Sequence, residues 1–313
     1  MTIDQRGGIA IAEIVLYFPI LILSIFLVVR HGATRKAGWI FFAILSIVRI
    51  TGGITHVLWE QNPTNTSLQT IFSIMESAGL SPLLMATLAF LSIVGQYTLE
   101  NHPAMSTRTF RLLHLLGTVA IVLAIIGGTN ISSAKSQSDL NTAATLRHAG
   151  SLLFLAFFAL IAALTAFCWL QRDQILKYRR KLLLAILASL PFLLVRILYS
   201  VLSAFAPLPF AFDSAEHMVP VVSNSPLKQF SSTSGSWAIY LVMSVLAEYA
   251  VVLIYTFAGV RLPLKQDLAD YQKAGMHMRT MSEEALTEHA GARPYDSAYA
   301  QPYSQPYSQP YSR

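Results

Sequence analysis

Seven stretches of the chain are each long and apolar enough to cross a lipid bilayer, and they restrict the fold more than any other feature. A transmembrane helix needs about 20 predominantly apolar residues. Charged residues make up only 12% of the 313 residues, too few to cover a soluble protein of this size. The sequence therefore predicts an all-α bundle of seven transmembrane helices, at approximately 9–29, 38–58, 71–95, 111–130, 148–170, 182–205 and 237–260.

The basic residues of the loops predict how these helices are oriented. Lysine and arginine are concentrated in the loops at 30–37, 96–111 and 171–181, whereas the loops at 59–70, 131–147 and 206–236 hold few. Because cytosolic loops are enriched in these residues, the N-terminus is predicted outside and the C-terminus in the cytosol. Two candidate glycosylation sites, Asn65 and Asn130, fall on the predicted outer side. This topology suits the plasma membrane or another membrane of the secretory pathway.

The end of the chain differs in composition from the spans. Residues 263–313 are polar and finish with three copies of Gln-Pro-Tyr-Ser at 301–312, a composition that cannot bury an apolar core. We therefore expect a membrane domain at 1–262 and a mostly disordered cytosolic tail at 263–313. The tail, or the basic loop at 171–181, is the candidate site for a cytosolic partner. The net charge of +6 lies in loops and indicates no nucleic-acid partner.

Several ionisable residues lie inside the predicted spans, where a charge that faces lipid is costly. Arg49 and Glu248 fall near the bilayer midplane, and Arg196 lies close to it. Residues three, four or seven apart share a helix face, so Arg49 shares a face with Gly52, Gly53 and His56, and Arg196 with Tyr199. The sequence thus predicts a polar interior biased towards the outer side. Its candidate residues are Glu13, Arg49, His56, Glu76, Arg196, Tyr199 and Glu248.

This polar interior has two interpretations. The charges are either internal ion pairs that hold the helices together, or a site for a ligand, an ion or a proton. In both cases Arg49 is expected to pair with Glu248, so that reversing both charges should recover the expression lost by either change alone. Three prolines inside the spans, Pro19, Pro82 and Pro191, are expected to kink their helices.

Other residue patterns argue against specific chemistries. The last span has no lysine for a retinal Schiff base, and no catalytic residue or cofactor is indicated. The predicted outer side offers His56, His148 and His217 without metal-binding spacing, so we expect no metal site. The single cysteine, Cys168, excludes an intramolecular disulfide.

Four segments resemble a known family: IAEIVLYFPILILSIFLVVRHG (11–32), GWIFFAILSIVRITGG (38–53), NPTN (62–65) and GLSPLLMATLAFLS (79–92). They are similar to a fungal family of uncharacterised multi-span membrane proteins, domain of unknown function 7702, over roughly residues 5–262. The resemblance implies an integral membrane protein of filamentous fungi with no established activity. It also implies that Glu13, Arg49 and Pro82 belong to the family pattern.

Together these patterns favour a receptor-like or sensory seven-helix bundle, in which an outward-facing polar pocket binds a small molecule from the outer side. The first alternative is a transporter or lipid-handling protein that uses the charges as its coupling site. The second is a structural membrane scaffold. A cavity that opens outward among the polar groups would favour a ligand, whereas a sealed and fully paired interior would favour the scaffold.

Overall fold

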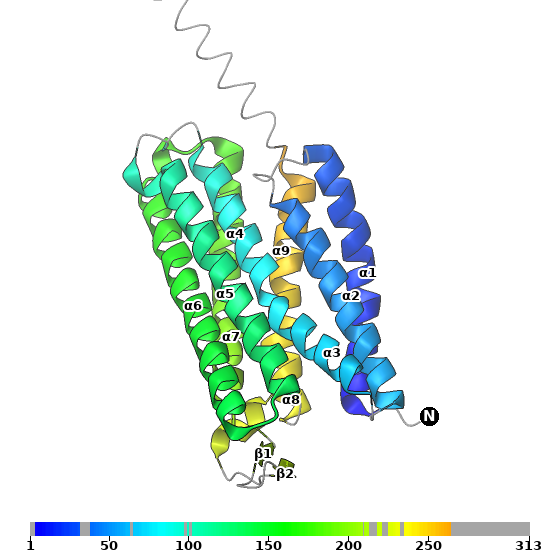
Figure 1. Ribbon diagram of the computed structural model, residues 1–313. Helices are drawn as coiled ribbons and strands as arrows, with labels where there is room; N and C mark the ends of the chain where they lie inside the picture. The colour runs from blue at the N-terminus through cyan, green and yellow to red at the C-terminus, as the bar shows by residue number, and fades with distance from the viewer. Residues whose placement is uncertain are drawn as a thin grey trace, which may run out of the picture. The chain divides into compact units, whose positions relative to one another are not determined.

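In the computed structural model, the described residues are 4–31, 38–62, 65–96, 99, 102–208, 210–212, 218–220, 225–231 and 235–263. They belong to the first of two compact units, Met1–Asp267, and the second unit is Leu268–Arg313. Seven helical segments of this first unit are long and apolar enough to span a membrane (Figure 1). The predicted all-α seven-helix bundle is therefore confirmed. The predicted tail beyond residue 263 lies outside the described residues, and the orientation remains a prediction.

The first six spans follow one another as long helices joined by short connections, whereas residues 205–236 separate the sixth span from the seventh. Helices α1, α2, α5, α6 and α7 each form one span, α3 and α4 together form the third, and the last consists of α8, a π-helix and α9. A small antiparallel hairpin pairs Ala211 with Val219. The bounds are α1 Gln5–His31, α2 Trp39–Gln61, α3 Thr66–Ala78, α4 Leu80–Gly95, η2 Pro103–Met105, α5 Thr107–Ser133, α6 Gln137–Leu170, η3 Arg172–Gln174, α7 Lys177–Ala204, β1 Phe210–Phe212, β2 Met218–Pro220, η4 Pro226–Phe230, α8 Trp237–Ile239, the π-helix η5 Tyr240–Leu246 and α9 Ala247–Arg261.

Two loops predicted from the sequence are shorter than expected. Helix α6 begins eleven residues before the predicted span, because the Ser136 side chain and Asp139 form a capping box at Gln137. Helix α5 continues to Ser133, so the predicted loop at 131–147 is wrong, and the glycosylation candidate Asn130 lies within a helix. Helix α7 likewise begins at Lys177, inside the predicted basic loop. A search for apolar stretches misses such helix ends because their residues are polar.

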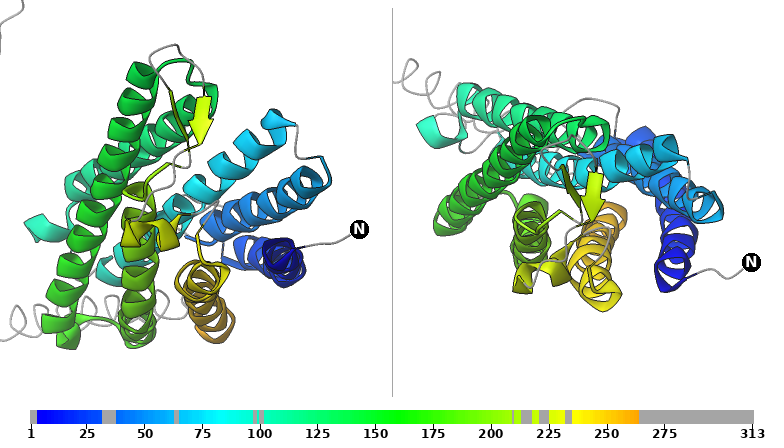
Figure 2. Two further views of the ribbon diagram at one scale, coloured as in Figure 1. Left: turned by 90° about the horizontal axis from the view of Figure 1, so that it is seen from below. Right: turned by 60° about the horizontal axis from the view of Figure 1, so that its bottom comes forward.

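The third span is the centre of the bundle. In the apolar stretch that defines this span, 94% of the residues are buried inside the protein, against 28–44% in the corresponding stretches of the other six spans. The chain crosses obliquely from α3, beside α2, to α4, which approaches α7. Figure 2 shows the same arrangement from the end of the bundle that holds the hairpin. Helix α5 packs along α6, and α1 along α2.

The third span was predicted as one helix but consists of two. Helix α3 ends at Ala78 and α4 begins at Leu80. A proline ring clashes with the carbonyl group four residues earlier, and Ala78 is four residues before Pro82, so the proline explains the position of this break. In contrast, α1 and α7 continue past Pro19 and Pro191 without an interruption in their helical assignment.

Candidate functional site

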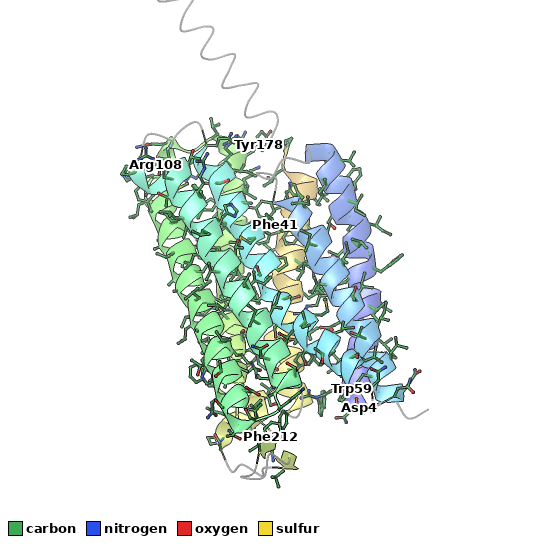
Figure 3. The ribbon with its side chains drawn as sticks, viewed as in Figure 1. Asp4, Phe41, Trp59, Arg108, Tyr178 and Phe212 are labelled. Carbon is green, nitrogen blue, oxygen red and sulfur yellow. The ribbon has the colours of Figure 1, made fainter. Side chains whose placement is uncertain are left out.

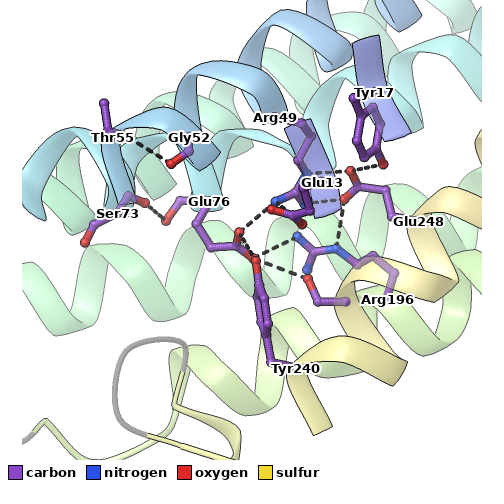
Figure 4. Close-up of polar contacts among 12 residues, drawn as sticks. Glu13, Tyr17, Arg49, Gly52, Thr55, Ser73, Glu76, Arg196, Tyr240 and Glu248 are labelled. Carbon is purple, nitrogen blue, oxygen red and sulfur yellow. Dashed lines mark hydrogen bonds and ion pairs between the residues drawn. The ribbon is translucent and has the colours of Figure 1, made fainter. Parts of the chain in front are cut away.

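Five charged side chains from five helices meet in the interior, and we call them the ionic cluster (Figure 4). All are largely withdrawn from solvent, with side-chain exposures between 0% and 9%. Because a charge in the membrane interior is tolerated when it faces the bundle and has partners, this convergence explains how the chain accommodates them. The members are Glu13 of α1, Arg49 of α2, Glu76 of α3, Arg196 of α7 and Glu248 of α9.

Arg49 uses most of its guanidinium donors inside the ionic cluster. Its Nε donates to Glu248 Oε1 at 2.6 Å, and its Nη2 donates to Oε2 of the same carboxylate. Its Nη1 donates to Glu76 Oε2 at 2.7 Å, and Glu13 Oε1 lies 3.9 Å from Nη1. The planar guanidinium forms the two-pronged contact that arginine favours with carboxylates. The Arg49–Glu248 pair expected from the sequence is present, but it is not isolated.

Arg196 joins the same two carboxylates from the opposite side. Its Nε lies 3.2 Å from Glu248 Oε2, and its Nη2 lies 3.5 Å from Glu76 Oε1. Glu76 and Glu248 therefore each bridge both arginines. Glu13 is the outlying member, since its buried Oε1 has no hydrogen-bond partner among the described residues. With three carboxylates and two guanidiniums, the cluster holds one acidic group in excess.

The break in the third span makes room for Arg49. A β-carbon placed on Gly79 would lie 2.9 Å from Arg49 Nη2 and 3.1 Å from its Cζ. Both distances are shorter than an ordinary contact, so a larger residue at this position would displace the guanidinium. The glycine between α3 and α4 thus helps to position the cluster.

Hydroxyl groups add hydrogen bonds to two of the glutamates, Glu248 and Glu76. Tyr17 donates to Glu248 Oε1 at 2.9 Å. Tyr240 donates to Glu76 Oε2 at 3.0 Å, and Ser244 donates to Glu76 Oε1 at 3.3 Å. Both Tyr240 and Ser244 lie on the π-helix. Such wide turns, with hydrogen bonds between residues five apart, frequently occur at functional sites.

The contribution of the π-helix can be tested with Tyr240→Phe. This change removes a hydrogen bond to a buried carboxylate, and polar contacts of this kind between membrane helices contribute about 0.6–1.7 kcal/mol. We expect a lower melting temperature in detergent, measured by intrinsic fluorescence. Tyr249→Phe is the matched control, because the Tyr249 ring packs edge-on against Tyr17 and its hydroxyl makes no hydrogen bond among the described residues. Equal losses in the two variants would contradict this assignment.

His56 does not contact the arginines and lies nearer the end of the bundle. Its Nε2 is 3.2 Å from Glu60 Oε1, and its ring packs against Phe72 at 4.4 Å between centroids. With Glu13 it lines a cavity of about 10 Å³. Ligand atoms of His56, Glu60 and Asp4 lie within 4.8 Å of one another, which makes these the described residues best placed to hold a cation.

The Asp4 carboxylate already has a structural role near this histidine. It accepts hydrogen bonds from the backbone N–H groups of Arg6 at 2.7 Å and Gly7 at 2.8 Å. These bonds stabilise the charged carboxylate, and the bond from Gly7 is the main cause that lowers the pKa of Asp4 below its ordinary value. Asp4 therefore serves as the N-terminal cap of α1, and the absence of a metal site remains a prediction.

A polar cavity of about 50 Å³ adjoins the ionic cluster on the side of α5, α6 and α7. Glu76 and Arg196 belong to both the cluster and the wall of this cavity. Tyr199, also in the wall, has a hydroxyl group without a hydrogen-bond partner among the described residues. Its ring lies 5.9 Å from the guanidinium carbon of Arg196. The structure thus brings together Glu76, Arg196 and Tyr199 at one cavity.

Arg147 is the residue of this cavity that the sequence analysis missed. It was assigned to a loop, but it lies on α6 and lines the cavity. Its Nη2 donates to the backbone oxygen of Ser203 at 2.9 Å and to the Ser203 hydroxyl at 3.2 Å. No carboxylate lies within 4.0 Å of it in the part of the chain that the structure describes. The only sequence signal was a single arginine close to a span on the side with few basic residues.

The other sequence-derived candidates lie away from this centre. Asn65 is exposed and caps α3, where its side-chain oxygen accepts hydrogen bonds from the backbone N–H groups of Ser67 at 3.1 Å and Leu68 at 3.4 Å. Asn130 is exposed on α5. Both remain candidate glycosylation sites, whereas His217 lies outside the described residues.

The fold and the ionic cluster define a class: an integral, multi-pass membrane protein with seven helices and a charged, hydrogen-bonded interior. Residues 3–223 match the family described as Domain of unknown function (DUF7702), and the chain belongs to this family. The match includes Glu13, Arg49, Glu76 and Arg196, but it ends before Glu248 and is shorter than the resemblance expected over 5–262. A search of curated proteins finds no similar sequence.

Proposed function

We propose that this protein is a receptor-like, sensory membrane protein that binds a small anionic ligand from the outer side, in the polar cavity next to the ionic cluster. The site lies near the end of the bundle that carries Ala204 and the start of α6, which the loop charges assign to the outside. The same reasoning favours the plasma membrane or another membrane of the secretory pathway. The sequence resemblance favours a fungal source.

The observation that supports an anionic ligand is that Arg147 forms no ion pair among the described residues. The cavity wall carries the guanidiniums of Arg147 and Arg196 and one carboxylate, Glu76. Arg196 and Glu76 are already engaged with the ionic cluster, whereas the Arg147 guanidinium, within the described part of the chain, donates to the neutral oxygens of Ser203. A charge in such a place is stabilised by a partner of opposite sign. An anion in the cavity would supply that partner and accept a hydrogen bond from Tyr199.

The size of the cavity limits what can enter it. One water molecule needs about 10–15 Å³ of cavity volume. A cavity of about 50 Å³ therefore holds a few water molecules. The same space suits a small anion.

Binding of an anion in this cavity would also change the contacts between helices. Arg196 and Glu76 are shared by the cavity wall and the ionic cluster. An anion that draws Arg196 away from Glu76 or Glu248 would weaken the ties between α7, α3 and α9. A ligand that binds one helix arrangement more tightly than another shifts the population towards it. This difference in affinity between two helix arrangements is the physical basis of a sensory role.

The proposal is tested by thermal stability with simple anions. We expect millimolar acetate or inorganic phosphate, compared with a matched concentration of gluconate, to raise the melting temperature of the purified full chain. Ligand binding to the folded state stabilises it by an amount that grows with the logarithm of the ligand concentration relative to Kd. Arg147→Gln should abolish this rise, whereas Lys135→Gln should retain it, because Lys135 is exposed and does not line the cavity.

Two outcomes would contradict the proposal. If no anion stabilises the unmodified protein more than gluconate does, or if Arg147→Gln responds as the unmodified protein does, the cavity is not an anion site. A receptor should also bind its ligand without transporting it across the membrane. Concentrative uptake of the stabilising anion into liposomes that contain the protein would therefore favour a transporter instead.

A further inference from the structure

A second and larger cavity, of about 800 Å³, forms a groove along α4 between α2 and α5. The groove shares no lining residue with the polar cavity. Phe41 of α2, labelled in Figure 3, lines one wall. Phe110 and Ile121 of α5 line the opposite wall, and the floor is a face of α4 with small residues such as Ala89 and Ser92.

Most of the groove presents an apolar surface to whatever fills it. The Ser92 hydroxyl donates to the Ala89 backbone oxygen at 2.8 Å, and the Thr118 hydroxyl donates to the His114 backbone oxygen at 2.8 Å. These hydroxyls are thus satisfied by their own helices and need no outside partner. An occupant of this part of the groove is selected by apolar contact.

One end of the groove is polar and basic. Arg111, Thr107 and Gln96 lie there, where α5 begins and α4 ends. Arg111 is exposed and makes no ion pair within the described part of the chain. None of the described residues that line the groove is acidic. This end lies on the side that the loop charges assign to the cytosol, where anionic lipids attract basic residues.

The length of the groove matches an acyl chain. Its floor extends from Ser81 to Gln96 on α4, about 22 Å at 1.5 Å per residue. Half the hydrocarbon thickness of a bilayer is about 15 Å, so one acyl chain can lie within the groove. The groove belongs to spans two, three and four, and at their depth the surrounding medium is hydrocarbon.

We propose that this groove binds an anionic phospholipid of the adjacent leaflet, with an acyl chain along α4 and its phosphate at Arg111. The apolar floor accounts for the chain, and the basic end, where none of the described lining residues is acidic, accounts for the head group. The deep end at Ser81 lies two residues from Gly79, the glycine against which Arg49 packs. The lipid would therefore stabilise the break in the third span that positions the ionic cluster.

The test uses the full chain in mild detergent and measures the melting temperature as phosphatidylglycerol or phosphatidylcholine is added. We expect stabilisation at lower concentrations of phosphatidylglycerol. Arg111→Gln should weaken the apparent affinity for phosphatidylglycerol about fivefold, since one basic residue contributes about 1 kcal/mol to the binding of anionic lipid. Ser92→Leu, which fills the floor, should weaken the binding of both lipids. Arg108→Gln is the matched control, since Arg108 lies at the same end of the bundle (Figure 3) but does not line the groove.

Each alternative gives a different result. If Arg108→Gln loses as much affinity as Arg111→Gln, the effect is a general attraction between basic residues and anionic lipid, and the groove has no specific role. If inorganic phosphate stabilises the unmodified protein but not Arg111→Gln, the groove takes a soluble anion rather than a lipid. If Ser92→Leu leaves the binding of both lipids unchanged, no acyl chain lies in the groove. Any of these results would overturn the proposal.

Discussion

Replacing Arg49 by glutamine is expected to remove most of the correctly folded protein. Arg49 contacts three carboxylates at once, and without it Glu13, Glu76 and Glu248 share only Arg196. Removing one partner of a buried ion pair costs about 3–5 kcal/mol, because it leaves an uncompensated charge. That loss is comparable with the whole stability of a marginal protein. The measurement is the yield of the monodisperse peak in size-exclusion chromatography, together with its melting temperature.

Further substitutions in the ionic cluster distinguish a network of ion pairs from a single pair between Arg49 and Glu248. Glu248→Gln leaves two guanidiniums with two carboxylates and should be milder than Arg49→Gln. The neutral double variant, Arg49→Gln with Glu248→Gln, restores the single acidic excess of the unmodified protein. We therefore expect it to be more stable than Arg49→Gln alone. Arg108→Gln, which removes an exposed arginine, should leave the yield unchanged.

The charge-reversed double variant gives the sharpest contrast. A simple Arg49–Glu248 pair predicts that reversing both charges recovers the expression. In the structure, R49E would place a carboxylate beside Glu76 and Glu13, and E248R would place a guanidinium beside Arg196. We therefore expect no recovery from the reversal, but a partial recovery from the neutral double variant. Recovery by reversal would show that Arg49 and Glu248 act as an independent pair.

Replacing Gly127 by alanine is expected to destabilise the bundle, whereas the same change at Gly128 is not. A β-carbon on Gly127 would lie 2.6 Å from the backbone nitrogen of Arg147 and 2.9 Å from its Cα. These backbone atoms of α6 cannot move aside as a flexible side chain would. Close approach of transmembrane helices at small residues is a common packing mode, and overpacking such a contact costs about 1–3 kcal/mol.

Gly128 is the matched control because it is the next residue of α5 after Gly127 and faces Ser77 instead of the backbone of Arg147. A β-carbon there would meet only the Ser77 hydroxyl, at 3.8 Å, an ordinary contact. Alanine in a helix interior is favoured over glycine by about 0.5–1 kcal/mol, so Gly128→Ala should be neutral or slightly stabilising. The measurement is the melting temperature of both variants in the same detergent. Similar shifts in the two variants would show that α5 and α6 are not in close contact at this point.

The sequence was sufficient to predict the class of fold and the presence of charges in the interior. Seven spans follow from local composition alone, because each apolar stretch must be long enough to cross the bilayer whatever its neighbours are. That Arg49, Arg196 and the three glutamates lie inside the bundle follows from the cost of exposing them to lipid. The boundaries of α6 could not be predicted in this way, since its first turns are polar and depend on the Ser136 cap.

The pairing of the charges could not be predicted, since it depends on how the helices pack. The sequence placed Glu248 near the midplane and Glu13 and Glu76 in the outer half, but only the packing of α2 and α7 around them shows that Glu76 and Glu248 bridge both arginines. Tyr240 is four residues before Ser244 and eight before Glu248, so helical spacing places it on their face. Only the tertiary structure shows that its hydroxyl meets Glu76 of α3. His56 shares a face with Arg49, yet it lies further along the helix and pairs with Glu60 instead.

For this protein, local sequence determines which segments enter the membrane and which side chains they carry into it, because hydrophobicity acts residue by residue. The order of the helices around α4, the packing of Arg49 against Gly79 and the cavity at Arg147 depend on contacts between segments far apart in the chain. Such contacts follow from shape and from charge balance among several helices at once. The tertiary structure therefore decides that Arg49 belongs to a five-residue cluster rather than to a single pair.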